Sequence, residues 1–152
     1  MSDLGLTHVA FAVRDIGKSV AFYERYAAMH VVHQRSDPAK ESAVAWVSDL
    51  TRPFVIVLIQ AKGLKDTPLG PFGHLGVACA SRSEVDRLAR MAAADGVLAS
   101  PPQDAGPPVG YWAYIRDPDG NMLEVAHGQE VAFAIQQAVP ADGADDAQRA
   151  AP

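Results

Sequence analysis

The sequence predicts an α+β fold in which two paired βαβββ modules form a curved mixed sheet around a cleft, with the helices outside. The first observation is a duplication, because the strand-like segments around His8 and His74 are related by 74 − 8 = 66 residues. Trp46 and Tyr114 stand in similar segments related by 114 − 46 = 68 residues. This period is longer than that of solenoid repeats, so it indicates one module used twice. The other two observations are strand-like alternation and helix-like apolar spacing within each module.

Alternating apolar residues predict the strands. In residues 6–13, Phe11 and Val13 fall on one face and His8 falls on the other. The expected strands cover residues 6–13, 30–35, 42–48 and 54–60 in the first module, and 73–79, 110–116 and 121–127 in the second. The Asp117-Pro118-Asp119-Gly120 segment predicts the turn between the last two strands, since it has proline where φ is preset and glycine where φ is positive.

One helix is expected in each module. Asp15 is a suitable N-cap, and an apolar stripe at helical spacing follows it over residues 16–27. In the second module Ser81 and Glu84 form a capping-box pattern, and Gly96 ends the helix. The Pro-rich stretch 101–110 then interrupts the pattern, and we interpret it as a plain connector or a lid over the cleft.

The domain organisation follows from these elements. A single domain covers residues 4–128, with modules at about 4–62 and 70–128. Residues 139–152 are rich in Ala, Asp, Pro, Gln and Gly without apolar periodicity, so we expect a disordered tail.

Composition restricts the classes of function. The chain has 152 residues, of which 49% are hydrophobic and 20% charged, as expected for one soluble globular domain. Its net charge of −5 and the lack of a Lys/Arg cluster argue against a nucleic-acid partner. No apolar run is long enough to span a membrane, and the N-terminus has no export-signal pattern. The single cysteine, Cys79, is expected to be a small packing residue, and the predicted location is cytoplasmic.

Three polar residues are predicted to point into the cleft. The helix should cover the face that carries Leu123 and Val125, which places Glu124 on the opposite face, and the same parity places His8 and His74 there. Two imidazoles and one carboxylate form a suitable site for a divalent first-row metal, and three protein ligands leave positions open for water or substrate. The alternative is that each is a surface or hydrogen-bonded core residue.

The cleft should also have aromatic walls. Trp46 and Tyr114 occupy equivalent repeat positions, and Trp112 has the parity of Tyr114. Such walls, with one hydroxyl group, suit a flat and partly apolar oxygenated ligand. We therefore assign substrate binding to Trp46, Val57, Trp112, Tyr114 and Met122, and catalytic roles to Tyr114, as a hydrogen-bond donor, and to His33, as an acid or base. The alternatives are that the tryptophans only pack within the sheet and that His33 is a surface residue of an edge strand.

A family resemblance supports this interpretation. Val13-Arg14-Asp15 after His8, then Gly73-His74-Leu75, and above all the segment from Asp117 to Glu124 resemble the vicinal oxygen chelate superfamily. This superfamily includes glyoxalase I, type I extradiol dioxygenases, fosfomycin-resistance thiol transferases and bleomycin-resistance proteins. The resemblance covers about residues 4–128 and implies paired βαβββ modules, a metal held by His8, His74 and Glu124, and a homodimer.

One departure from the family narrows the chemistry. Subtracting the repeat length from Glu124 gives 124 − 67 = 57, and no Asp, Glu or His occurs between Asp49 and Asp66. Members with glyoxalase I activity have a fourth ligand at this position, a carboxylate that assists proton transfer. Val57 cannot act as a base, so glyoxalase I activity proper is not expected.

Three hypotheses follow for the function. The first is an extradiol-dioxygenase-like enzyme with Fe²⁺, acting on a small substrate whose vicinal oxygens chelate a site of net charge +1. The second is a lyase, isomerase or thiol transferase that uses Mn²⁺, Ni²⁺, Co²⁺ or Zn²⁺. Fosfomycin-resistance enzymes resemble this chain at Tyr114, although Ala10 stands where they have threonine. The third is a metal-free protein that sequesters a drug.

Overall fold

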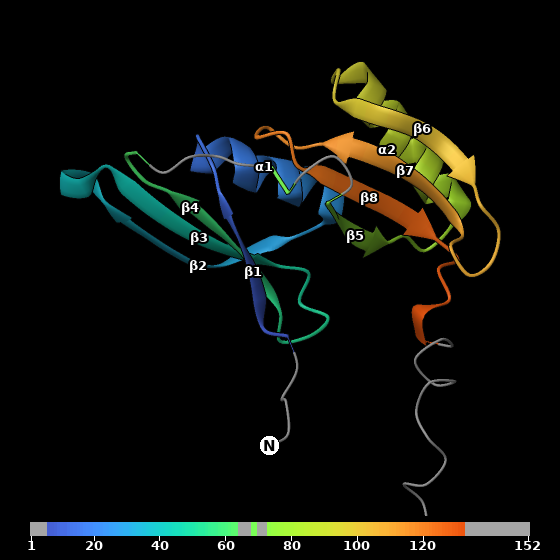
Figure 1. Cartoon of the computed structure of the whole chain (residues 1–152), viewed down its shortest axis with the longest axis horizontal. Helices are drawn as coiled ribbons and strands as arrows, with labels where there is room; N and C mark the ends of the chain where they lie inside the picture. The colour runs from blue at the N-terminus through green and yellow to red at the C-terminus, as the bar shows by residue number, and fades with distance from the viewer. Residues whose placement is uncertain (1–5, 64–67, 70–72, 133–152) are drawn as a thin grey trace, which may run out of the picture.

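The computed structural model describes residues 6–63, 68–69 and 73–132, so the predicted tail lies outside the described residues. Each module has the expected order of elements (Figure 1). The first contains β1 (His8–Ala12), α1 (Ile16–Ala27), β2 (His30–Asp37), the short 3-10 helix η1 (Pro38–Lys40), β3 (Ser42–Ser48) and β4 (Val55–Gln60). The second contains β5 (His74–Ala78), α2 (Arg82–Ala94), β6 (Leu98–Asp104), β7 (Tyr111–Arg116) and β8 (Met122–His127).

The strands form two mixed sheets of the same topology. Their orders are β1-β4-β3-β2 and β5-β8-β7-β6. In each sheet the first pair of strands is parallel, and the remaining pairs are antiparallel. The predicted α+β class and the paired βαβββ modules are therefore confirmed.

The register shows that the duplication holds residue by residue. Glu124 lies opposite Tyr114 on β7 and opposite Gly76 on β5. Val57 lies opposite Trp46 on β3 and opposite Ala10 on β1. Since Gly76 follows His74 by two positions and Ala10 follows His8 by two, Val57 is the structural counterpart of Glu124.

The interpretation of the Pro-rich stretch was wrong in part. Residues 101–104, expected in a connector or lid, belong to strand β6, which pairs with β7. The strand lies at the edge of its sheet, and its register shifts between Leu98 and Ser100 and again between Ser100 and Gln103. Proline is tolerated at edges and bulges because the missing N–H need not serve a neighbouring strand. The strand therefore contains Pro101 and Pro102 and still pairs with β7.

The helix boundaries follow the predicted caps. The Asp15 carboxylate accepts a hydrogen bond from the backbone N–H of Lys18 at 3.1 Å, and the Ser81 hydroxyl accepts one from Glu84 N–H at 3.2 Å. Gly96 follows α2 with a φ of +72°, the left-handed conformation that favours glycine. The caps thus fix where each helix begins relative to the strand before it.

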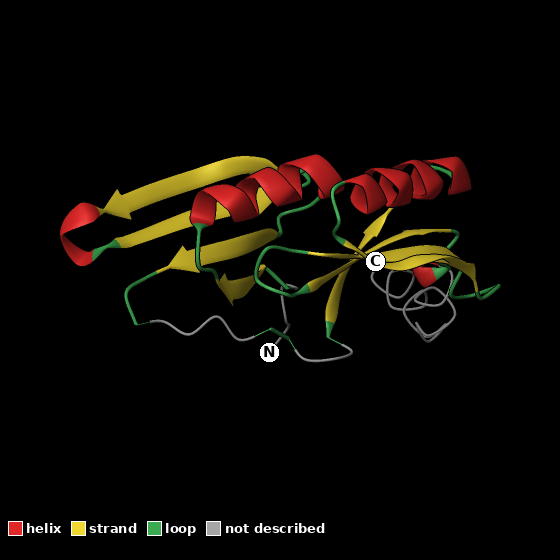
Figure 2. Cartoon of the chain, turned by 90° about the horizontal axis from the view of Figure 1, so that it is seen from above, coloured by secondary structure: helices red, strands yellow, loops and turns green. Residues whose placement is uncertain are grey.

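The helices cover one face of each sheet. Helix α1 packs against β3 and β4, and α2 packs against β6, β7 and β8. The two helices lie end to end on one side of the molecule (Figure 2). The buried side chains of both modules form one continuous apolar core, which includes Phe11, Tyr23, Leu58, Val85, Ile115 and Leu123. No helix among the described residues is long and apolar enough to cross a membrane.

A polar seam joins the modules on this helical side. The Asp119 carboxylate, in the turn before β8, is 6% exposed and accepts hydrogen bonds from the backbone N–H of Arg14 (3.0 Å), from Arg14 Nε (3.0 Å) and from the Ser19 hydroxyl (3.1 Å). The Tyr23 hydroxyl donates to Asp117 at 3.0 Å. Burial, followed by the charge of Asp117, raises the pKa of Tyr23 well above its usual range, so this hydroxyl remains a donor.

Replacing Asp119 should therefore destabilise the whole domain. Asp119→Ala removes the acceptor for three donors and leaves the Ser19 hydroxyl buried, so we expect the free energy of unfolding to fall by about 2–4 kcal/mol. Urea denaturation followed by circular dichroism measures the change. Lys62→Ala, which breaks an exposed ion pair with Glu41, is the control and should have little effect. Equal losses in both variants would contradict a structural role for the seam.

Candidate functional site

The second sheet brings together two of the three predicted metal ligands. His74 is the first residue of β5, and Glu124 lies in the middle of the adjacent parallel strand β8. His74 Nε2 lies 3.3 Å from Glu124 Oε2. Glu124 is only 6% exposed, whereas the side chain of His74 is 37% exposed. A buried carboxylate next to an imidazole nitrogen is a donor pair that suits a divalent metal ion.

Two further side chains hold this carboxylate. The Gln129 carboxamide donates a hydrogen bond to Glu124 Oε1, the oxygen that does not face His74. The phenol of Tyr114 has a raised pKa, first because of burial and then because of a hydrogen bond to Glu124 and the charge of that carboxylate. We name His74, Tyr114, Glu124 and Gln129 the acidic half-site.

The sequence analysis missed Gln129. It follows β8, outside the repeated pattern, and its backbone segment is held by the hydrogen bond from Glu130 N–H to the carbonyl of Pro108 at 3.0 Å. Gly110 packs against the same segment, because a Cβ there would lie 2.5 Å from the carbonyl oxygen of His127. The position of Gln129 depends on how the segment after β8 packs against the loop before β7, and such a contact leaves no periodic pattern in the sequence.

Aromatic residues border the acidic half-site. The rings of His74 and Tyr114 lie 5.2 Å apart, and those of Tyr114 and Trp112 lie 4.8 Å apart. Met122 is half-buried and lies opposite His74 in the register of β5 and β8. The structure thus groups Trp112, Tyr114 and Met122 around the pair of ligands, while their predicted roles in substrate binding stay predictions.

The remaining predicted residues lie on the first sheet. There a hollow of about 570 Å³ is bordered by Ala10, Val44, Trp46, Val55, Val57 and Ile59, together with Thr7, His8, Arg35 and Pro53. We name it the apolar hollow. Trp46 is 41% exposed, and its ring lies 4.9 Å from that of His33 on the edge strand β2. The Thr7 hydroxyl and His8 Nδ1 lie 3.0 Å apart. The volume is in the range of small-molecule sites.

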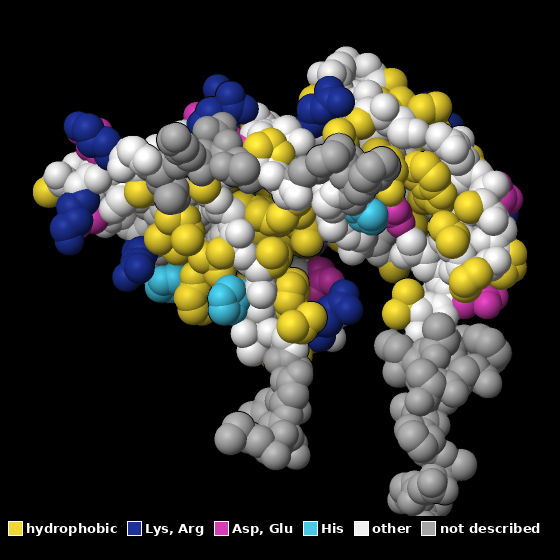
Figure 3. All heavy atoms as spheres, viewed as in Figure 1, with side chains coloured by type: hydrophobic (Ala, Val, Ile, Leu, Met, Phe, Trp, Pro, Cys, Tyr) yellow, Lys and Arg dark blue, Asp and Glu magenta, His cyan; other side chains and the backbone are white. Residues whose placement is uncertain are grey.

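One chain does not bring all three predicted ligands to one place. Within the described residues, no three His, Cys, Asp or Glu side chains are close enough to hold a metal ion together. His8 lies on the first sheet, whereas His74 and Glu124 lie on the second. Histidine side chains accordingly occur in separate places on the molecular surface (Figure 3). The polar seam connects the modules through their helical side, so the apolar hollow and the acidic half-site do not close on each other.

The contact between Tyr114 and Glu124 predicts a spectroscopic effect. A carboxylate beside a phenol disfavours the phenolate, so Glu124→Gln should lower the pKa of Tyr114 toward its ordinary value. Ultraviolet titration of the metal-free protein measures the change. Tyr114→Phe identifies which transition belongs to this residue among the tyrosines. An unchanged tyrosine titration in Glu124→Gln would exclude the contact.

Comparisons with known proteins identify the family and agree with the fold. Residues 5–125 match the model of the glyoxalase/bleomycin resistance protein/dioxygenase superfamily. The uncharacterized protein PA2024 of Pseudomonas aeruginosa is 38% identical over 82% of this chain and 89% of its own length. The fold is similar to that of glyoxalase I from Zea mays (TM-score 0.64, 23% identity), of which the chain covers 43% while 80% of the chain is aligned. It is also similar to a fosfomycin resistance protein, FosX, from Listeria monocytogenes (TM-score 0.68, 21% identity), with 88% of this chain and 99% of that chain covered. The chain therefore belongs to the glyoxalase/bleomycin resistance/dioxygenase superfamily.

Proposed function

We propose that the protein is a divalent-metal-dependent enzyme whose metal centre is shared between two copies of the chain. His74 and Glu124 of one copy would hold the ion together with His8 of a second copy. The observation that carries this proposal is the pairing of a buried carboxylate with an imidazole, 3.3 Å apart, on β8 and β5 of the second sheet. These donors fit a first-row divalent ion and leave coordination positions open.

The need for a second copy follows from how the modules are joined. The modules are joined through α1, whose Ser19 and Tyr23 bond to the turn before β8, and the described residues leave the apolar hollow and the acidic half-site on separate sheets. The apolar hollow exposes Trp46, and the neighbouring edge strand exposes Val32. A two-fold contact that places the apolar hollow of one copy against the acidic half-site of the other would cover both faces and generate two equivalent sites.

The residues of the site define the type of substrate. When bound, the metal would act as a Lewis acid toward two adjacent oxygens of a small molecule. Glu124 reduces the charge of the centre to +2 − 1 = +1, which favours an anionic oxygen on the substrate. The pKa of Tyr114 is raised, so its hydroxyl keeps its one proton, which is directed to Glu124 in the metal-free chain and would turn to a substrate oxygen once the carboxylate held a metal. The FosX structure was described with Mn(II) and a dihydroxypropylphosphonic acid, a ligand that has adjacent hydroxyl groups.

The superfamily is named both for glyoxalase and for a dioxygenase. We propose redox-neutral chemistry as the reaction class, because Lewis-acid activation needs only a bound metal and the side chains of the acidic half-site. The Fe²⁺-dependent dioxygenase reaction expected from the sequence stays a prediction. Oxygen uptake by the iron-loaded protein with a catechol is the measurement that separates the two classes.

Subunit complementation tests the shared centre. His8→Ala and Glu124→Ala should each abolish tight Mn²⁺ binding, because each removes one ligand from every site. Co-expression of the two variants should restore about a quarter of the sites, since half of the dimers are mixed and each mixed dimer has one intact site. Metal content after size-exclusion chromatography measures the recovery.

The same experiment has clear contrary outcomes. If the centre formed within one chain, the mixture would contain no intact site. If His8 took no part, His8→Ala would bind the metal as well as the wild type. Thr7→Ala is the matched control, because it changes the neighbouring side chain without removing a proposed ligand.

The position of Val57 predicts a restriction on the activity. It is the counterpart of Glu124 and lies in the apolar hollow, whose described lining contains no Asp or Glu. We expect no lactoylglutathione lyase activity from the wild-type protein, because a base is missing at this position. Val57→Glu should add a carboxylate on the side of His8 and tighten Mn²⁺ binding. Val57→Gln serves as the uncharged control, and equal affinities in these two variants would argue against the placement.

A further inference from the structure

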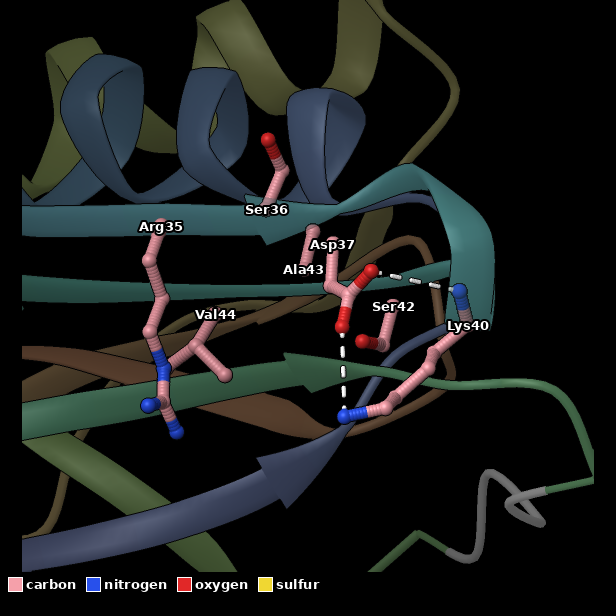
Figure 4. A pocket seen from close by; sticks show the side chains of 7 residues that line it. All are labelled: Arg35, Ser36, Asp37, Lys40, Ser42, Ala43 and Val44. Atoms are coloured by element: carbon pink, nitrogen blue, oxygen red, sulfur yellow. Dashed lines mark hydrogen bonds and ion pairs between the residues drawn. The ribbon is translucent and has the colours of Figure 1, made fainter.

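Arg35 lines the apolar hollow, and no described residue forms an ion pair with it. It extends from β2 and lines the hollow beside Val44, the residue opposite it on β3. Its guanidinium has no hydrogen bond or ion pair with any described residue. The nearest candidate in sequence, Asp37, is instead engaged by Lys40, with Nζ 3.3 Å from one carboxylate oxygen and the backbone N–H 3.4 Å from the other (Figure 4).

The surroundings of Arg35 favour an anionic ligand. Among the described residues no Asp or Glu lines the apolar hollow, although the whole chain has a net charge of −5. A smaller hollow of about 200 Å³ reaches Arg35 from the end of the β2–β3 hairpin, and the Asp37 carboxylate in it is paired with Lys40. An uncompensated guanidinium in an acid-free hollow produces a local positive potential, and its planar donors bind carboxylate, sulfonate or phosphonate groups in a bidentate manner.

The register places Arg35 far from His8. Arg35 lies opposite Val44, Val44 opposite Ile59, and Ile59 opposite Ala12 on β1. At one end of this row, Ala12 lies four residues beyond His8 on β1. At the other end, Arg35 lies on β2, three strands away from β1. Strand spacings of roughly 4.8 Å and rises of roughly 3.3 Å per residue separate the two Cα atoms by on the order of 20 Å on a flat sheet. Trp46 and Val57 lie in the row opposite Ala10, between these two residues, and all four side chains line the hollow.

We propose that the apolar hollow binds the body of an elongated, amphipathic anion and that Arg35 binds its acidic end. The apolar or aromatic body lies against Trp46 and Val57, and the remote carboxylate, sulfonate or phosphonate meets the guanidinium. This inference deepens the proposed function, because the same hollow contains His8. It describes the part of the substrate away from the reacting oxygens, so it can be tested on metal-free protein.

Two fluorescent probes of the same ring system test the proposal. Anilinonaphthalene sulfonate carries one anionic group, and phenylnaphthylamine is its uncharged parent. Protein treated with a chelator should bind the sulfonate about tenfold more tightly than the uncharged probe, as expected for one charged hydrogen-bonded contact. Arg35→Met should remove this preference and leave the affinity for the uncharged probe unchanged, whereas Arg35→Lys should retain part of it.

Two control variants test whether the preference for the sulfonate comes from Arg35 and whether the probes bind in the apolar hollow. Arg52→Met removes a guanidinium that already pairs with Asp49 at 3.2 Å, so the preference should survive. Trp46→Ala should weaken both probes, because it removes a wall of the hollow. The proposal is overturned if Arg35→Met keeps the preference, if the wild type shows none, or if Trp46→Ala affects neither probe. Because no metal is present, these results do not depend on the complementation experiment with His8 and Glu124.

Discussion

The organisation of the molecule depends on the polar seam around Asp119. This carboxylate is buried in the turn before β8, and its donors among the described residues all belong to the first module: the Arg14 backbone and guanidinium and the Ser19 hydroxyl. Leaving such a buried charge without donors is strongly unfavourable, so the turn before β8 stays against α1 and Arg14. The described residues then present the apolar hollow on the first sheet and the acidic half-site on the second. The open apolar hollow, and the separation of His8 from Glu124, follow from this one constraint.

Duplication gave the two faces the same framework and different chemistry. At one position of the register the first sheet has Val57 and the second has Glu124, and at the next strand they have Trp46 and Tyr114. The second sheet therefore supplies a charge and a hydroxyl group, while the first supplies an apolar surface and Arg35. These side chains complement each other. A site made from one face of each kind would therefore combine metal ligands and a hydroxyl group with an apolar surface and a cation.

The structural features that could be predicted from the sequence are those that depend on a regular period. Alternation along β8 placed Glu124 on the face opposite to Leu123 and Val125, and the repeat placed His74 on the strand that pairs with it. Strand β6 was not placed from the sequence, because Pro101 and Pro102 usually interrupt strands and their tolerance depends on the edge position. Gln129 was missed because a loop contact sets its position. The separation of His8 from His74 was not predictable, because periodicity indicates which face a residue lies on and not which faces meet.

A centre shared between two copies would couple metal binding to assembly. An ion that binds only when His8 of one copy meets Glu124 of another stabilises the dimer by its full binding free energy, and the dimer in turn raises the affinity for the ion. The donors that hold Glu124 limit the cost of this arrangement in the separate chain, since Gln129 and Tyr114 contact the buried carboxylate before any ion arrives. The acidic half-site is thus preorganised within each chain, and the second copy would need to supply only an imidazole and an apolar wall.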